Sequence, residues 1–384
     1  MLDTIYLDYN ATAPLRPEAA AAMQAFLGPP ANPSSVHGYG QHARALLDEA
    51  RAEVAALAGC SPEAVIFTSG GTEANAIALG SHASEYQDDA LIMTTAIEHD
   101  AVLAASRSAE RLPVTATGIV CLDTLESRLQ AMAGQYAPEC DKGPGKKLLL
   151  SVMAANNETG VVQPLAEIIA LARRYGGLVH SDAVQAFGKL PLPAPGTGDR
   201  GLDMMSISAH KIGGPAGVGA LLMREGLAIR PLAGGGGQES NRRPGTENLI
   251  GIIGFGAAAR ATRLQGAWPE HLPAWQRQFE QRIKAAAPEA VIFGTAAERL
   301  GNTSCIAMPG RRAETQVISL DLAGIAVSAG AACSSGKVSQ SHVLAAMGAG
   351  SLAESAIRVS AGWASQRQDF DRLAEAWIRL YKQG

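Results

Sequence analysis

Residues 64–82 read AVIFTSGGTEANAIALGSH and combine three patterns that predict one structural unit. The run Ala64–Thr68 is short, apolar and rich in strand formers, which is typical of a buried strand. Ser69-Gly70-Gly71 indicates a turn, and the residues after it have the composition of a helix. A helix that opens directly after such a turn presents free backbone N–H groups and the positive end of its dipole. The turn is therefore a candidate phosphate site, although glycine turns without a ligand are common.

The alternation of strand and helix continues through the first two thirds of the chain. Further apolar runs predict strands at Ala90–Thr95, Leu148–Ala154, Leu178–Ser181, Met204–Ser208 and Gly219–Met223. Helical patterns lie between them, for example Pro164–Tyr175, which opens on a proline. Strands that alternate with helices predict the α/β class, with a mostly parallel sheet covered on both faces. In such sheets, ligands bind beyond the carboxyl ends of the strands.

A looser segment, about Ala261–Pro273, interrupts this pattern and indicates a boundary. Beyond it lie a charged helix at Trp275–Ala286, short strands near Cys305 and Val327, and a closing helix at Asp369–Lys382. These elements predict a smaller α+β domain. We expect a large domain of residues 15–260, and a small domain that combines residues 1–14 with 261–384. A chain of 384 residues is long enough for about two or three domains.

The composition argues against several classes of function. The formal net charge is -4 and the 32 basic residues are dispersed, which disfavours nucleic-acid and membrane-surface binding. The first residues, MLDTIYLDYN, do not form a secretory signal, and no apolar run is long enough to span a bilayer. The five cysteines are few and scattered, and no cysteine or histidine has a metal-ligand spacing. We expect a cytoplasmic protein without a metal site.

Three polar residues follow predicted strands and suit an aldehyde cofactor. Lys211 lies in SAHKIGGPAG, where a partly desolvated amine could form an imine. Asp182 ends another strand, and a pyridoxal ring needs a carboxylate beside its nitrogen. Gln185, three residues further, could reach the phenolic oxygen of the ring. Each has a simpler alternative when taken singly: Lys211 as a surface lysine and Asp182 as a helix cap.

Ordered motifs run along almost the whole chain: LDYNATAP, TSGGTEAN, EHDAV, AANNETGVVQP, HSDAVQAFGK, SAHKIGGPAGVG, GGGGQES, RRPGTEN and IRVSAGW. This set resembles the class V aminotransferase group. Within that group it looks like a cysteine desulfurase of the nitrogen-fixation or iron–sulfur-cluster type. The resemblance implies a fold type I pyridoxal-phosphate enzyme, with pyridoxal 5'-phosphate as cofactor and a homodimer as the functional unit.

The resemblance also implies roles for individual residues. Those expected to hold the cofactor are Gly71, Thr72, His99, Asn157, Asp182, Gln185, Ser208, His210, Lys211 and Thr246, the last from across the dimer interface. His99 would also stack on the ring and assist proton transfer, and Lys211 would carry the cofactor. Arg358 would clamp the substrate carboxylate, with Asn32 close by. Considered without the other motif residues, His99 would equally be a histidine of the core, and Arg358 would be part of a surface ion pair.

Sulfur chemistry is predicted from residues 327–337, VSAGAACSSGK, in which Cys333 stands among small residues. Small residues leave the backbone free to reorient. The resemblance makes Cys333 the nucleophile that takes sulfur from L-cysteine as a persulfide, leaving L-alanine. An acceptor such as an iron–sulfur scaffold protein would then receive the sulfur. The simpler role for a free cysteine is a buried apolar one, which we assign to Cys60, Cys121 and Cys305, with Cys140 as an exposed loop thiol.

Other functions remain open. A selenocysteine lyase or a transaminase of the same fold would keep the cofactor residues without needing Cys333. A non-catalytic scaffold would have no reason to keep both Lys211 and Asp182. Ser240 stands where relatives often have an arginine, so contacts near GGGGQES can differ from theirs.

Overall fold

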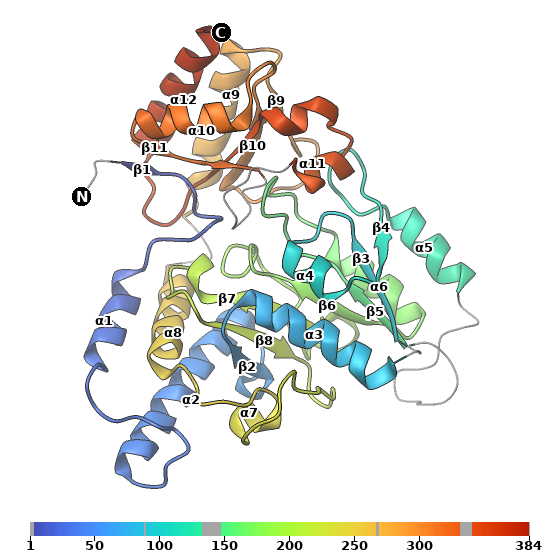
Figure 1. Cartoon of the computed structure of the whole chain (residues 1–384), viewed down its shortest axis with the longest axis vertical. Helices are drawn as coiled ribbons and strands as arrows, with labels where there is room; N and C mark the ends of the chain where they lie inside the picture. Colours follow the sequence, from blue (N-terminus) through green and yellow to red (C-terminus); the bar gives the residue numbers. More distant parts are fainter. Residues whose placement is uncertain (1–3, 88–89, 133–146, 266–268, 331–339, 384) are drawn as a thin grey trace.

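The computed structural model describes residues 4–87, 90–132, 147–265, 269–330 and 340–383, which form two units, each built around a sheet (Figure 1). The helices are α1 Pro17–Ala25, α2 Gly38–Ala58, α3 Gly71–Tyr86, α4 Asp100–Ala105, α5 Leu122–Ala131, α6 Leu165–Arg174, α7 Gln238–Asn241, α8 Leu249–Leu264, α9 Leu272–Ala286, α10 Ala313–Leu322, α11 His342–Ala346 and α12 Arg367–Lys382. The strands are β1 Ile5–Tyr6, β2 Val65–Thr68, β3 Ala90–Thr95, β4 Glu110–Leu112, β5 Lys147–Ser151, β6 Leu178–Asp182, β7 Met204–Ser208, β8 Gly219–Met223, β9 Val291–Ile292, β10 Thr303–Ala307, β11 Ile325–Ala326, β12 Ser328–Ala329 and β13 Ala356–Ser360. None of the helices in these ranges has the length and apolar character that crossing a bilayer requires.

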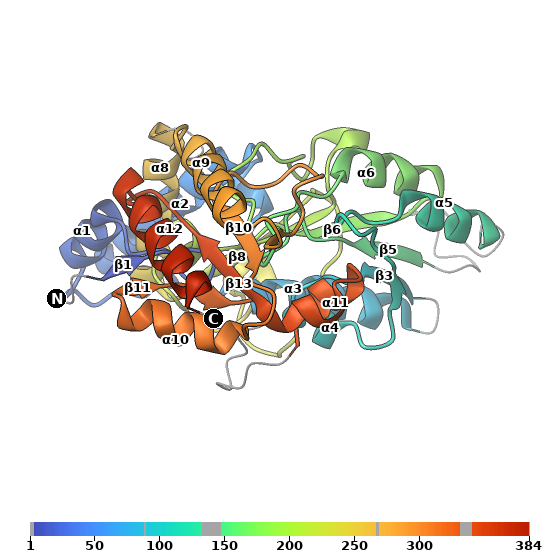
Figure 2. The ribbon, with the colours of Figure 1, turned by 90° about the horizontal axis from the view of Figure 1, so that it is seen from above.

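The larger sheet has the strand order β2-β8-β7-β6-β5-β3-β4. The strands from β4 to β7 pair in parallel, and β8 is antiparallel to both of its neighbours. Alternate residues of β5 pack on opposite faces: Leu148 and Leu150 join a cluster with α2, α6 and α8, whereas Leu149 joins one with α3 and α4. Figure 2 shows the sheet between these helices. The predicted α/β class with a mostly parallel, doubly covered sheet is confirmed.

The smaller unit contains the antiparallel sheet β12-β13-β10-β9 and the pair β1-β11, covered by α9, α10 and α12. Its core is centred on side chains such as Trp377 and Phe279. The pairing of β1 with β11 supports placing the start of the chain in this unit. The exact division at 14/15 and 260/261 stays a prediction. One expectation is wrong in detail, because α8 continues to Leu264 and the first part of the looser segment is helical.

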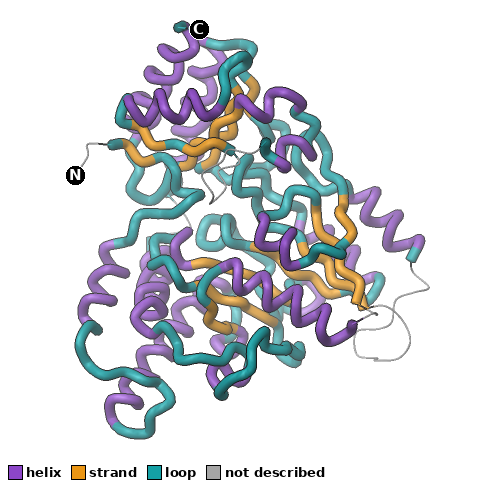
Figure 3. Tube along the Cα trace, in the orientation of Figure 1, coloured by secondary structure: helices purple, strands orange, loops and turns teal. Residues whose placement is uncertain are grey.

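A further apolar cluster joins the two units. Ile97 and Met153 from the larger unit pack with Phe293, Cys305 and Val343 from the smaller one. The backbone trace in Figure 3 shows the loops at the carboxyl ends of the larger sheet lying against the strands of the smaller unit. This packing brings Arg358 of β13 to the same cavity as residues that follow β6 and β7.

Candidate active site

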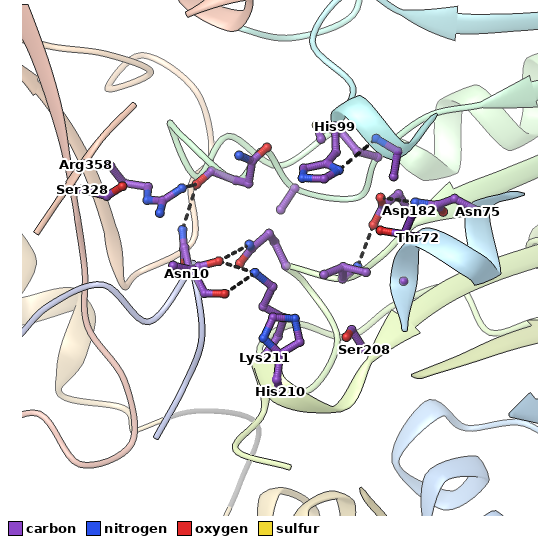
Figure 4. A pocket seen from close by; sticks show the side chains of 18 of the residues that line it. Asn10, Thr72, Asn75, His99, Asp182, Ser208, His210, Lys211, Ser328 and Arg358 are labelled. Carbon is purple, nitrogen blue, oxygen red and sulfur yellow. Dashed lines mark hydrogen bonds between the residues drawn. The ribbon is translucent and has the colours of Figure 1, made fainter. Parts of the chain in front are cut away.

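A cavity of about 400 Å³ lies at the carboxyl ends of β5, β6 and β7, between the two units (Figure 4). Most of the predicted site residues line this one cavity: Gly71, Thr72, His99, Asn157, Asp182, Gln185, Ser208, His210, Lys211 and Arg358. They come from segments far apart in the sequence, and their meeting follows from the parallel strands, whose carboxyl ends share one edge of the sheet. Cavities of this size suit a small cofactor together with a small substrate.

Lys211 ends a short 3-10 turn, Ala209–Lys211, directly after β7. Its amine donates hydrogen bonds to two backbone carbonyl groups, those of Asn10 and Ala11, the latter at 2.8 Å. Burial and, to a smaller extent, the nearby positive charge of Arg358 lower the pKa of the Lys211 amine to about 8. A fraction of the amine is therefore neutral near pH 7, as a nucleophile requires.

Asp182 ends β6 and is held in place by two hydrogen bonds. Asn75 Nδ2 donates to Asp182 Oδ2 at 2.7 Å, and the Val184 backbone N–H donates to Oδ1 at 3.0 Å. Asn75 belongs to α3 and is itself buried. Figure 4 shows Asp182 beside Asn75 and Thr72, on the opposite side of the cavity from Arg358. The Asp182 carboxylate is thus held in one orientation at the wall of the cavity.

Gln185 is oriented by contacts at both ends of its amide. Its Nε2 donates to the Asn10 carbonyl oxygen at 2.9 Å, and its Oε1 accepts from Lys189 Nζ at 3.3 Å. The Asn10 carbonyl oxygen can only accept, so it must face the NH₂ group of the Gln185 amide, and the Lys189 amine then donates to the amide oxygen. Gln185 therefore keeps its NH₂ group on the side of Asn10.

The glycine turn after β2 leads directly into α3, as predicted, and the cavity wall is tight there. A Cβ at Gly71 would lie 2.7 Å from Val184 Cγ2, so only glycine fits without a shift. Thr72, in the first turn of α3, and Ser208, at the end of β7, line the cavity wall here, where the first N–H groups of a helix lack partners within the helix. His210 lies on the same side, and burial together with Lys211 lowers the pKa of its ring to about 4. Its imidazole is therefore neutral at physiological pH.

His99 is the N-cap of α4, and its Nδ1 accepts a hydrogen bond from the Ala101 backbone N–H at 3.1 Å. An accepting Nδ1 places the proton of the neutral ring on Nε2. Figure 4 shows the ring at the rim of the cavity above Asp182. His99 can thus offer an Nε2 proton to a group in the cavity.

Arg358 lies in β13, where its backbone neighbours are Cys305 of β10 and Ser328 of β12. Its guanidinium donates to Asp8 Oδ1 at 2.8 Å and to the Asn157 carbonyl oxygen at 3.2 Å. Only 6% of the residue is exposed. The Arg358 guanidinium is the positive charge that an anionic substrate would contact on this side of the cavity.

Three predicted residues are not part of this arrangement. Asn32 is exposed, and its Oδ1 accepts from the Ser34 backbone N–H at 2.9 Å instead of facing the cavity. Thr246 is exposed and does not line the cavity of this single chain. Cys333 lies outside the described residues, as does Cys140. Their predicted roles stay predictions.

The remaining cysteines differ from one another. Cys305 is fully buried, as expected, and burial raises the pKa of its thiol. Cys60 is only partly buried but packs against the core of the larger unit, whereas Cys121 is partly buried and belongs to none of the apolar clusters of the described residues, so the predicted core role is wrong for Cys121. Cys121 precedes α5, and a hydrogen bond from Thr124 to its sulfur lowers the pKa of the thiol.

Sequence reasoning assigned no role to four residues of this network: Asp8, Asn10, Asn75 and Lys189. The Asn10 carbonyl oxygen accepts from both Gln185 and Lys211, so it is the point where the two meet. Each of the four residues belongs to one of the quoted sequence motifs, and this was the one signal from which a role could have been inferred. What the motifs lack is any indication of which side chains meet across the fold.

The carboxyl edge of this open α/β sheet carries a half-buried lysine amine and a carboxylate. Together they define an enzyme that binds its cofactor through a lysine. The chain belongs to the aminotransferase class-V family, which matches residues 5–373. A cysteine desulfurase from Cereibacter sphaeroides is 40% identical, over 97% of this chain and 95% of that protein. The predicted family resemblance is confirmed.

Solved structures agree with this assignment. A NifS-like protein from Rickettsia africae superposes with a TM-score of 0.86 at 33% identity, over 99% of both chains. SspA, described in complex with cysteine, superposes with a TM-score of 0.78 at 27% identity, over 94% of this chain and 99% of that one. The fold type predicted from the motifs is thereby confirmed.

Proposed function

We propose that this chain is a pyridoxal-phosphate-dependent cysteine desulfurase, which converts L-cysteine to L-alanine and passes the sulfur to Cys333 as a persulfide. The observation that carries the proposal is the convergence of Lys211, Asp182 and Arg358 on one cavity. They supply an amine, an acidic partner and a carboxylate-binding cation. The similarity to proteins named cysteine desulfurase supports the choice of substrate.

The residues of the cavity fit pyridoxal 5'-phosphate. The missing Cβ of Gly71 leaves room beside the first turn of α3, where backbone N–H groups and the helix dipole favour a phosphate. Thr72, Ser208 and His210 add polar groups there. Asp182 would hold the proton of the ring nitrogen, and the Gln185 amide NH₂ would donate to the phenolic oxygen. When bound, the cofactor withdraws electrons from the α carbon of an amino acid substrate.

The chain's own residues supply the proton transfers and the positioning. Lys211 Nζ, whose pKa is lowered to about 8, takes the proton from the α carbon of the substrate. Arg358 binds the α-carboxylate through its guanidinium, and Asn157 lies beside it. His99 offers its Nε2 proton to the reacting groups. The Cys333 thiolate attacks the substrate sulfur, the carbon–sulfur bond breaks, and protonation of the remaining carbon gives alanine.

The wider setting follows from the same proposal. A homodimer would place the exposed Thr246 of one protomer at the phosphate site of its partner, and Asn32 would approach the substrate carboxylate. An iron–sulfur scaffold or a related sulfur carrier would accept the sulfur from Cys333. We place the enzyme in the cytoplasm, in agreement with its dispersed charge and scattered cysteines.

The test is an assay of alanine and sulfide from L-cysteine in the presence of a thiol reductant. The native protein should form both in equal amounts, and Cys333→Ala should form neither while it retains the yellow colour of the bound cofactor. Cys121→Ala is the matched control, because it removes a partly exposed thiol outside the cavity. Full activity of Cys333→Ala would favour a lyase that releases the chalcogen directly. No product from the yellow native protein would favour a transaminase.

A further inference from the structure

Asp8 forms an ion pair with the guanidinium that receives the substrate in the function proposed above, and this inference rests on that function. The pair joins Asp8 Oδ1 to Arg358 Nη2 at 2.8 Å, with side-chain exposures of 19% and 7%. Asp8 belongs to the first segment of the chain, and 350 positions separate it from Arg358. A pair this well shielded from water is screened weakly by solvent and salt.

The donors of Arg358 are already partly occupied. Nη2 donates to Asp8, Nη1 donates to the Asn157 carbonyl oxygen, and Nε is buried without a hydrogen-bond partner among the described residues. Nη1 and Nη2 each carry a second N–H, which leaves donors for a carboxylate in the cavity. That carboxylate would then share one guanidinium with the carboxylate of Asp8.

We propose that the Asp8 carboxylate is a built-in competitor at Arg358, which weakens the binding of every carboxylate there and so leaves little affinity for ligands held by a carboxylate alone. Two carboxylates on one buried guanidinium repel each other, so Asp8 reduces the affinity for any incoming carboxylate. An amino acid compensates because its amine is held as well. A simple carboxylic acid has no second anchor, and the ion pair therefore excludes it.

The backbone of Asp8 is fixed, so the competition is a property of its carboxylate alone. Asp8 forms a bridge to Ser360, and its carbonyl oxygen accepts from Tyr6 Oη at 3.0 Å and from the Ala11 N–H at 3.0 Å. Arg358 is held independently, by strands on both sides and by the Asn157 carbonyl oxygen. Asp8→Asn, which is isosteric, should therefore remove the charge and leave the guanidinium in place.

The experiment measures propionate binding to the holoenzyme. Propionate is a carboxylate without an amine, so it cannot react with the cofactor. Its inhibition constant against L-cysteine should fall by about tenfold or more in Asp8→Asn, since one like charge is gone. KM for L-cysteine should fall as well and kcat should not rise, because the lost repulsion acts on ground state and transition state alike. Asp199→Asn, an exposed aspartate outside the cavity, is the control and should match the native enzyme.

A thermal-shift titration with propionate, without L-cysteine, gives a second readout that does not depend on turnover. The shift at saturating propionate should be larger for Asp8→Asn than for the native holoenzyme, because the carboxylate replaces a missing counter-ion. If Asp8→Asn loses the cofactor colour, Asp8→Ser is measured in its place. An inhibition constant and a thermal shift that are unchanged, or weaker binding in the variant, would overturn the proposal and leave Asp8 as an orienting partner. A native enzyme that is yellow but inactive toward L-cysteine would instead refute the proposed function.

Discussion

The pKa of Lys211 predicts how the protein takes up its cofactor. An ordinary lysine amine has a pKa of 10.5, and burial with the charge of Arg358 lowers that of Lys211 to about 8. At pH 7 about a tenth of the Lys211 amine would be neutral, about 300 times more than for an unperturbed lysine. Only the neutral amine attacks an aldehyde, so the rate of cofactor uptake should rise about tenfold per pH unit below 8 and level off above it.

The assay starts from protein stripped of cofactor and follows the yellow absorbance after pyridoxal 5'-phosphate is added, from pH 6 to pH 10. Arg358→Met removes a positive charge beside the amine and should move the plateau to higher pH. Asp8→Asn removes a negative charge that raises the pKa, and should move the plateau to lower pH. Lys211→Ala should develop no stable colour. A native rate that rises without a break through pH 10 would refute the reasoning, because it would mean that the amine is not perturbed.

Three further outcomes are expected. Gly71→Ala places a Cβ 2.7 Å from Val184 Cγ2 and should weaken cofactor binding by about 1–3 kcal/mol, measured as the dissociation constant. Adding Val184→Ala to the same chain should restore most of the lost affinity. Asn75→Ala removes the 2.7 Å hydrogen bond to Asp182 and should lower the melting temperature of the holoenzyme, by the loss of about 1.5–3 kcal/mol. Burial lowers the pKa of Lys189 from 10.5 to about 7, so the folded protein releases this proton at a lower pH than the unfolded chain does. The free energy of unfolding of the native protein, minus that of Lys189→Met, should therefore rise from pH 7 to pH 10.5. If urea unfolding gives the same difference at pH 6.5 and at pH 9, this prediction is wrong.

The larger sheet was predictable because its strands are buried on both faces. Such strands appear as continuous apolar runs, and Leu148–Leu150 is one of them. Short or polar strands gave a weaker signal: β4, with the sequence Glu-Arg-Leu, was not predicted, and the single strand expected near Val327 is two strands of two residues, β11 and β12, in different sheets. Their pairing depends on neighbours that are distant in the sequence, and no local periodicity records it.

The candidate site was predictable where a residue follows a strand within a motif, as Lys211 and Asp182 do. Partners that meet only across the fold were not found. Lys189 contacts Gln185 only four positions away, but apart from its place in the HSDAVQAFGK motif nothing distinguishes it from a surface lysine. The contact between Asp8 and Arg358 spans 350 positions, and Asp8 lies beside β13 through a bridge to Ser360 that no local pattern records.

That separation bears on biosynthesis. The ribosome delivers Asp8 and Asn10 about 200 residues before Lys211, and Lys211 about 150 residues before Arg358. Asn10 cannot take its position beside Lys211 until β13 has emerged, because its backbone N–H donates to Ser360 Oγ at 3.0 Å. The pocket therefore stays incomplete until β13 has been made. Its assembly is a late step of folding, in which segments translated early and late close on each other.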